Sequence, residues 1–253
     1  MTVLKKLTGF IGAEIEGLAL SETISGADAD FLKKSLAEDQ VLVLRGQFLT
    51  PPQQKALTRV FGPAMQLPYV APLEDDPETI AVLKEASEAG GGVFGGEWHA
   101  DFSFLENPPA GSVLNAVEIP DVGGDTVWAS QVVAYRSLPA ALKSVVDGRN
   151  AVHVGKPYGV KHAPPSETRA NASIRMTRGD PEADREIFHP AVITEPITGA
   201  KALFLNPIYT TRFDGMTEEE SLPILQEIYR HCTRPDFSCR HKWQPGDVVI
   251  WDN

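Results

Sequence analysis

The residues of this sequence that could do chemistry together are His99 and Asp101, two positions apart within GGEWHADFSF at 95–104. In an extended strand, residues i and i+2 point to the same face, so both side chains can reach one point. A neutral imidazole and a carboxylate are two of the three ligands in the 2-His-1-carboxylate site, which binds non-haem Fe(II) and leaves coordination positions open. We therefore predict that His99 and Asp101 are metal ligands and catalytic residues.

The same spacing also suits a structural pair, in which a buried imidazole bonds to a carboxylate, and the two residues alone leave that alternative open. A third metal ligand, expected to be a second histidine, must come from a distant part of the chain. No remaining histidine lies in a context that marks it as the partner. These are His153, His162, His189, His231 and His241. His231 falls at the end of a predicted helix, where the helix dipole alone favours a histidine.

A glycine-rich segment, GGGVFGG at 90–96, precedes the pair. No G-K-[ST] follows it and no strand–helix context surrounds it, so it is not a phosphate-binding loop. We expect a flexible lip beside the site, with a plain surface loop as the alternative.

Composition limits the range of partners and locations. The 253 residues carry a formal net charge of −11, which argues against a general nucleic-acid or anionic-membrane surface. An anionic substrate would need local arginines. Only two cysteines occur, Cys232 and Cys239, and no signal peptide is recognisable, so we expect reduced thiols in a cytoplasmic protein. No run approaches the roughly 18 apolar residues that span a bilayer.

The elements that must position the pair are mostly short strands between Gly/Pro turns. Strands are predicted at 10–17, 41–45, 79–84, 112–118, 126–129, 191–194, 201–205, 237–243 and 247–251. Helices are predicted at 28–37, 51–61, 132–146 with a new start at Leu138-Pro139, and 217–231. This pattern favours a mainly β fold with flanking helices, a β-sandwich or jelly roll. The polar segment 154–187 is expected to be irregular, either a lid or a disordered loop.

Several segments together resemble a known family. They are WHADFSFLENPPAG at 98–111, GGDTVWA at 123–129 and WQPGDVVIWDN at 243–253, with LRGQ at 44–47, TPPQQ at 50–54, FG at 61–62, LN at 205–206 and TTR at 210–212. In this order they are similar to the taurine dioxygenase/2,4-D dioxygenase family of Fe(II)- and 2-oxoglutarate-dependent oxygenases. The resemblance spans nearly the whole chain.

The resemblance implies a double-stranded β-helix (jelly roll) with extra helices, forming one catalytic domain over 1–253. It implies iron held by His99, Asp101 and a distal histidine, and 2-oxoglutarate held by Thr126 of G-G-D-T and a distal arginine. In the family both distal residues follow W-D-N, so we expect the C-terminal end to be missing from this sequence. The alternative is a pseudoenzyme or a non-catalytic jelly-roll binding protein. The family often forms dimers or tetramers, so a homo-oligomer is expected.

The activity implied is hydroxylation of a small organic acid with O2, giving succinate and CO2. Taurine enzymes of the family carry a histidine where this sequence has Leu67. That difference favours a more apolar substrate than taurine itself, with sulfonate or aryloxy acids as candidates. Tyr69, Phe102 and Tyr209 are predicted to bind the substrate, with Phe94 beside them; ordinary core packing is the alternative for each.

Overall fold

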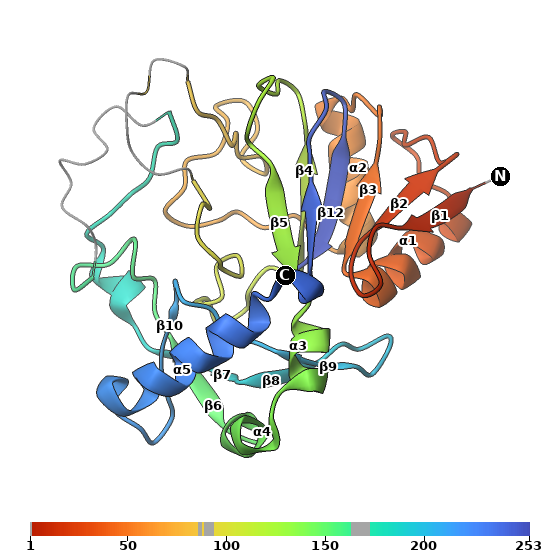
Figure 1. Cartoon of the computed structure of the whole chain (residues 1–253). Helices are drawn as coiled ribbons and strands as arrows, with labels where there is room; N and C mark the ends of the chain where they lie inside the picture. The colour runs from red at the N-terminus through yellow and green to blue at the C-terminus, as the bar shows by residue number, and fades with distance from the viewer. Residues whose placement is uncertain (1, 86–87, 89–93, 163–172) are drawn as a thin grey trace.

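A five-stranded sheet forms one half of the computed structural model, which describes residues 2–85, 88, 94–162 and 173–253 (Figure 1). Its strand order is β1-β2-β3-β12-β4. The bounds are β1 Val3–Lys6, β2 Ala13–Glu16, β3 Val41–Leu44, β4 Gly111–Asn115 and β12 Val248–Asp252. β12 lies antiparallel between β3 and β4, whereas β2 and β3 are parallel. The last strand of the chain is therefore central to the sheet.

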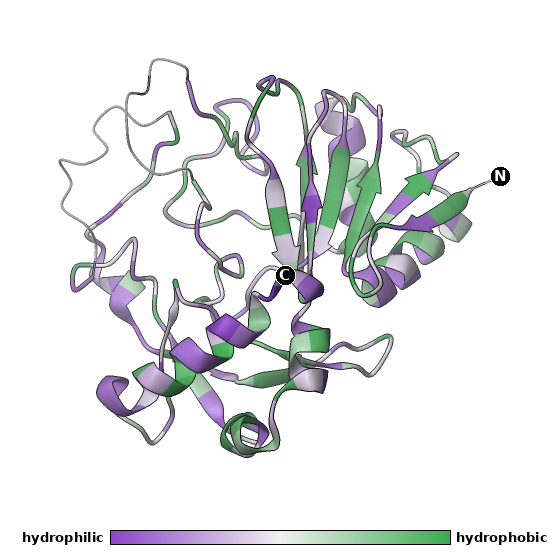
Figure 2. Ribbon diagram, viewed as in Figure 1, coloured by the Kyte–Doolittle hydropathy of each residue, from purple (hydrophilic) through white to green (hydrophobic). Residues whose placement is uncertain are grey.

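The two faces of this sheet pack against different partners because side chains alternate along each strand. On β3, Leu42 and Leu44 face helices α1 (Gly26–Asp39) and α2 (Pro51–Phe61) in one core cluster. The intervening Val41 and Val43 belong to a second cluster on the opposite face. All four side chains are buried, and Figure 2 shows this strand in hydrophobic colours.

The helix starts follow from capping residues in the sequence. Ser25 accepts a hydrogen bond from the backbone N–H of Asp28 at the start of α1. Thr50 and Gln53 form a capping box at the start of α2. Thr217 and Glu220 do the same at the start of α5 (Glu218–Cys232).

The second face of the large sheet is covered by a two-stranded ribbon. Strands β5 (Thr126–Ala129) and β11 (Ser238–His241) pair antiparallel in this ribbon. Trp128 of β5 packs against Trp251 of β12, with ring centroids 5.6 Å apart. The ribbon therefore carries Thr126 over the same sheet that contains β4 and β12.

The remaining elements form the other half of the molecule. A three-stranded sheet has the order β10-β6-β7, and β8 pairs with β9. The strands are β6 Asn150–His153, β7 Ile187–Pro190, β8 Val192–Thr194, β9 Lys201–Leu203 and β10 Thr210–Phe213. Helices α3 (Gln131–Ser137), α4 (Ala140–Val146) and α5 pack with these strands around a third core cluster that includes Phe213 and Ile228. Short 3-10 turns are η2 Pro181–Asp184 and η3 Pro235–Phe237.

The structure confirms a mainly β architecture with helices, and most predicted elements fall close to their expected places. The strand predicted at 79–84 is wrong: these residues are irregular, and Val82 and Leu83 are 54% and 47% exposed. Their apolar run has no neighbouring strand to pair with in the described chain. Conversely, β1, β6, β7 and β10 were missed. Each has only four residues, and β7 includes Pro190.

Two predicted segments lie partly outside the described residues. These are residues 90–93 of the glycine-rich lip and residues 163–172 of the insert. Cys232 and Cys239 are buried and form no disulfide with each other; their reduced state stays a prediction. No helix in the described ranges combines the length and hydropathy needed to cross a membrane.

Candidate active site

The His99 and Asp101 side chains converge, as predicted from their spacing. His99 Nε2 lies 3.2 Å from Asp101 Oδ1, and the side chains are 28% and 24% exposed. The extended geometry assumed for this spacing is absent, however: 97–100 is irregular and 101–104 forms a turn. Leu105 N–H donates to the Phe102 carbonyl at 3.0 Å, and Phe102 has a left-handed φ of 48°. A tight turn, not a sheet ladder, therefore fixes the pair.

Asp101 is held by partners from two adjacent strands. The Ser112 hydroxyl on β4 donates to Asp101 Oδ2 at 2.8 Å. Asn253, which follows β12, accepts a hydrogen bond from the Asp101 N–H through Oδ1 and donates through Nδ2 to the Asp101 carbonyl at 2.8 Å. Ser112 also lies opposite Trp251 in the sheet register. The large sheet thus orients both the backbone and the carboxylate of Asp101.

His99 is oriented by its own loop. Its Nδ1 lies 2.7 Å from the Glu97 carbonyl, which can only accept, so Nδ1 carries a proton. Gly95 approaches the other edge of the ring with a φ of +67°, and a Cβ there would lie 3.2 Å from His99 Cε1. Glycine suits position 95 for two reasons: it adopts the positive φ readily, and it has no Cβ that would crowd the imidazole.

Each member of the pair stabilises the charged form of the other. Burial acts to lower the pKa of His99, but the hydrogen bond and charge of Asp101 outweigh it, so the pKa is raised. Burial acts to raise the pKa of Asp101, yet His99 and Ser112 hold it below its usual value. The carboxylate is thus the favoured form of Asp101, with the Ser112 hydroxyl at one oxygen and the His99 imidazole nitrogen at the other.

This donor set fits a divalent metal. With Nδ1 protonated, Nε2 can present a lone pair beside Asp101 Oδ1, and two acceptors 3.2 Å apart need a proton or a metal ion between them. Imidazole nitrogen and carboxylate oxygen are ligands that iron accepts. Within the described ranges no group of three or more His, Cys, Asp or Glu residues forms a complete metal site. The predicted distal histidine stays a prediction.

Thr126, the predicted 2-oxoglutarate residue, begins β5 and is partly exposed. Its Oγ1 accepts a hydrogen bond from the Trp243 indole Nε1 at 2.9 Å. Among the hydrogen bonds of the described chain, none joins Thr126 directly to His99 or Asp101.

The three predicted substrate residues, Tyr69, Phe102 and Tyr209, belong to one aromatic cluster that also contains Phe104 and Tyr158. Tyr158 stacks on Tyr69 and on Phe102, with centroids 5.0 and 5.9 Å apart. Phe104 packs on Tyr209 at 4.9 Å. Burial raises the pKa of Tyr158 and of Tyr209, and the negative charge of Asp101 adds to the effect on both. The cluster therefore lies beside the His99–Asp101 pair.

The remaining histidines lie away from the pair in other roles. His153 bonds Ser103, His189 bonds the Leu105 carbonyl, and His241 bonds Asp247. His231 is in the last turn of α5, as predicted, with its Nε2 3.0 Å from the Ala134 carbonyl. His162 is exposed.

Sequence reasoning missed four contributors: Ser112, Asn253, Trp243 and Tyr158. Trp243 and Asn253 lie within a segment that carries the family resemblance, which was the available signal, and Ser112 directly follows another such segment. Tyr158 falls in the polar insert 154–187, where no periodicity marked it.

The whole chain is similar to a known family of enzymes. A family model described as "Taurine catabolism dioxygenase TauD, TfdA family" matches residues 4–253. An Acinetobacter baylyi protein named alkylsulfatase is 35% identical over 99% of this chain and 77% of its own length. A Pseudomonas putida alpha-ketoglutarate-dependent sulfate ester dioxygenase is 32% identical over 98% of this chain and 80% of its own. The crystal structure of a taurine dioxygenase from Burkholderia xenovorans superposes with a TM-score of 0.75 at 28% identity, covering 99% of this chain and 80% of that one.

The chain belongs to the TauD/TfdA family of dioxygenases. It is a 2-oxoglutarate-dependent dioxygenase, an oxidoreductase that requires Fe(II) and uses O2 on a small-molecule substrate.

Proposed function

We propose that His99 and Asp101 bind the iron of this enzyme, that Thr126 binds 2-oxoglutarate, and that the substrate lies against the aromatic cluster around Tyr158. The observation that carries this proposal is the separation of 3.2 Å between His99 Nε2 and Asp101 Oδ1, each group being fixed by its own partners. When bound, iron couples decarboxylation of 2-oxoglutarate by O2 to oxidation of a substrate C–H bond, giving succinate and CO2.

The protein's own residues orient the ligands and exclude water. The Glu97 carbonyl fixes the tautomer of His99, while Ser112 and Asn253 fix Asp101. Phe102 and Tyr209 are 4% and 5% exposed, so they form an apolar wall beside the pair. Such a wall keeps bulk water from the reacting groups and strengthens electrostatic contacts there.

The substrate class we favour is an alkyl sulfate ester or an alkanesulfonate with an apolar chain. Two relatives are named for action on sulfate esters. Leu67 packs against the aromatic cluster, which suits an apolar group better than the small polar chain of taurine. Aryloxy acids are the second class that an aromatic wall of this kind would accommodate.

A positive charge for the anionic end of the substrate is present at the edge of this cluster. Arg178 Nη1 donates to the Pro157 carbonyl at 2.9 Å. Pro157 directly precedes Tyr158 of the cluster, and the Arg178 charge opposes the effect of burial, which raises the pKa of Tyr158. We assign the sulfate or sulfonate group to this side. Replacement of Arg178 by Gln should then raise KM for the anionic substrate and leave the KM for 2-oxoglutarate unchanged.

The test is substrate-dependent succinate formation and O2 uptake with the full-length protein, Fe(II) and 2-oxoglutarate. The panel contains medium-chain alkyl sulfates, alkanesulfonates, taurine and aryloxyacetates. We expect turnover with at least one apolar sulfate or sulfonate, weak turnover with taurine, and no activity from His99→Ala. Absence of substrate-dependent succinate across the whole panel would overturn the proposed substrate class.

Four predictions of wider scope belong to the same proposal. The fold is a double-stranded β-helix. This is supported by the packing of the β5–β11 ribbon on one face of the large sheet, with one core cluster between them. The chain forms one catalytic domain, and the protein works in the cytoplasm as a homo-oligomer. Size-exclusion chromatography with light scattering measures the oligomeric state directly.

A further inference from the structure

We infer that Trp243 is a positioning residue that turns the Thr126 hydroxyl into a hydrogen-bond donor for the co-substrate carboxylate. The inference rests on the proposed role of Thr126 and adds a residue that acts through it. Trp243 is placed by the ribbon pairing. Thr126 lies opposite His241 in the β5–β11 register, and Trp243 follows two residues later. Its indole Nε1 reaches Thr126 Oγ1 at 2.9 Å.

The direction of this hydrogen bond decides what Thr126 can do next. An indole N–H can only donate, so the threonine oxygen must accept. A threonine hydroxyl has one hydrogen, and accepting from Trp243 leaves that hydrogen for a second partner. Within the described chain Thr126 Oγ1 makes no other hydrogen bond. A carboxylate is acceptor-only, so it is the complementary ligand for this hydroxyl.

Trp243 itself has little freedom to move. It is 7% exposed and belongs to the core cluster between the large sheet and the ribbon. The His241 ring meets it edge to face, with centroids 4.7 Å apart and planes at 89°.

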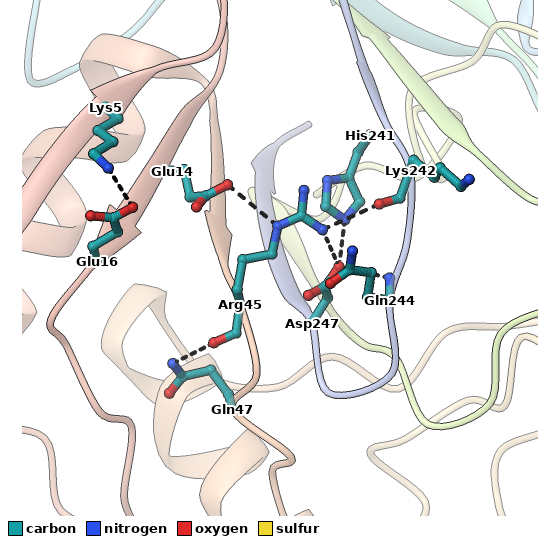
Figure 3. A network of polar contacts seen from close by, with 9 residues as sticks. All are labelled: Lys5, Glu14, Glu16, Arg45, Gln47, His241, Lys242, Gln244 and Asp247. Carbon is teal, nitrogen blue, oxygen red and sulfur yellow. Dashed lines mark hydrogen bonds and ion pairs between the residues drawn. The ribbon is translucent and has the colours of Figure 1, made fainter.

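The turn that carries Trp243 is fixed by the Asp247 carboxylate (Figure 3). Asp247 Oδ2 accepts hydrogen bonds from His241 Nε2 at 3.0 Å and from the Gln244 N–H at 2.8 Å. Arg45 Nη1 donates to the same oxygen and also to the Lys242 carbonyl, while Arg45 Nε pairs with Glu14. Because the charges and hydrogen bonds of three segments meet here, the indole is presented to Thr126 in one orientation.

The experiment measures binding of 2-oxoglutarate by calorimetry to the full-length protein with Mn(II) in place of Fe(II), so no turnover is required. Trp243→Phe keeps an aromatic ring and removes the N–H. We expect its Kd for 2-oxoglutarate to rise roughly five-fold, the effect of one net hydrogen bond. Trp128→Phe is the matched control, since Trp128 packs in the same interface against Trp251. Its Kd should stay within two-fold of wild type.

A double-mutant cycle separates positioning from packing. In a Thr126→Val background, Trp243→Phe should cause no further weakening, whereas in a Thr126→Ser background the roughly five-fold effect should persist. The Trp243 indole ¹H–¹⁵N resonance should also shift in Thr126→Val without any ligand. The inference would be overturned if Trp243→Phe weakened 2-oxoglutarate binding equally in the Thr126→Val and wild-type backgrounds, or in neither of them. The proposed function would stand in both cases. Failure of the wild type to bind 2-oxoglutarate would overturn both.

Discussion

The side-chain amide of Asn253 pairs with the backbone of Asp101 in both directions, across 152 residues of sequence. Oδ1 accepts from the Asp101 N–H, and Nδ2 donates to the Asp101 carbonyl at 2.8 Å and to the Pro109 carbonyl at 3.0 Å. The Asn253 N–H donates in turn to the Ala110 carbonyl at 3.2 Å. The segment after β12 is therefore joined to the turn that carries a proposed iron ligand.

Replacing Asn253 by Ala should weaken metal binding and lower stability together. The change leaves the Asp101 N–H and two carbonyls without their partner, which costs about 1–3 kcal/mol in the free energy of unfolding. Because the Asp101 backbone then moves more freely, Mn(II) affinity should fall about 10- to 100-fold. Electron paramagnetic resonance of free Mn(II) during titration measures the affinity.

The matched control for this change is Asn115→Ala on neighbouring β4. Asn115 Nδ2 donates to the Leu49 carbonyl at 3.1 Å and does not bond Asp101. This variant should lose stability while keeping Mn(II) affinity within about two-fold. Equal losses of affinity in the two variants would show that Asn253 acts only through global stability.

Ser112 offers a more local test of the carboxylate. Its hydroxyl donates to Asp101 Oδ2 at 2.8 Å and helps to keep the pKa of that carboxyl low. Ser112→Ala should reduce Mn(II) affinity about 10-fold, the usual effect of losing a partner of a metal ligand. Ser112→Thr retains the hydroxyl on a strand that favours β-branched residues and should bind Mn(II) like the wild type. If the Ala and Thr variants bind equally, the Ser112 hydrogen bond has no role in the site.

Local sequence patterns predicted the site better than they predicted the path of the chain around it. The two-residue spacing of His99 and Asp101 was sufficient to bring the side chains together, although the segment is a turn and not a strand. Two residues that are two positions apart stay close together in a turn as well as in a strand. The prediction that the two side chains meet was therefore correct, although the extended backbone assumed for it was not. The strand predicted at 79–84 failed for the opposite reason, because a strand needs a neighbour that no local pattern specifies.

What local patterns could not supply were the long-range partners. Asn253 reaches Asp101 only because β12 lies beside β4, the strand that carries Ser112. Trp243 reaches Thr126 only through the pairing of β11 with β5. These contacts depend on sheet register, which is set by packing of both faces and not by residues near the site.

Gly95→Ala should disturb the imidazole directly. The new Cβ would lie 3.2 Å from His99 Cε1 and 3.6 Å from Nε2, at a φ of +67° that disfavours alanine. Gly199→Ala imposes a similar backbone cost at φ +71°, with nothing within 4 Å of the new Cβ. Both variants should lose about 1 kcal/mol of stability, but only Gly95→Ala should lose Mn(II) affinity, by roughly ten-fold. Unchanged Mn(II) binding in Gly95→Ala would mean that the lip adapts without moving His99.

The buried His153 should make the stability of this protein depend on pH. Its Nδ1 lies 2.9 Å from Ser103 Oγ, which accepts a hydrogen bond from Asn206 Nδ2 and has its own hydrogen to donate to the Nδ1 of a neutral imidazole. Burial, with smaller contributions from the charges of His189 and Lys156, lowers the pKa of His153 to about 3. Because this is below the usual value of 6.5, the unfolded chain takes up the proton first as pH falls.

Stability contributed by neutral His153 is therefore complete above pH 6.5 and is lost progressively toward pH 3, with about 2 kcal/mol lost between pH 7 and 5. His153→Asn keeps an acceptor for Ser103 and removes the titration. In urea unfolding at pH 7, 6 and 5, the free energy of unfolding should fall more steeply for the wild type than for His153→Asn. Carboxylates and His99 titrate in both proteins, so their contributions cancel in the difference. Parallel pH profiles would mean that His153 is protonated in the native protein or accessible to solvent, which would contradict its burial against Phe204.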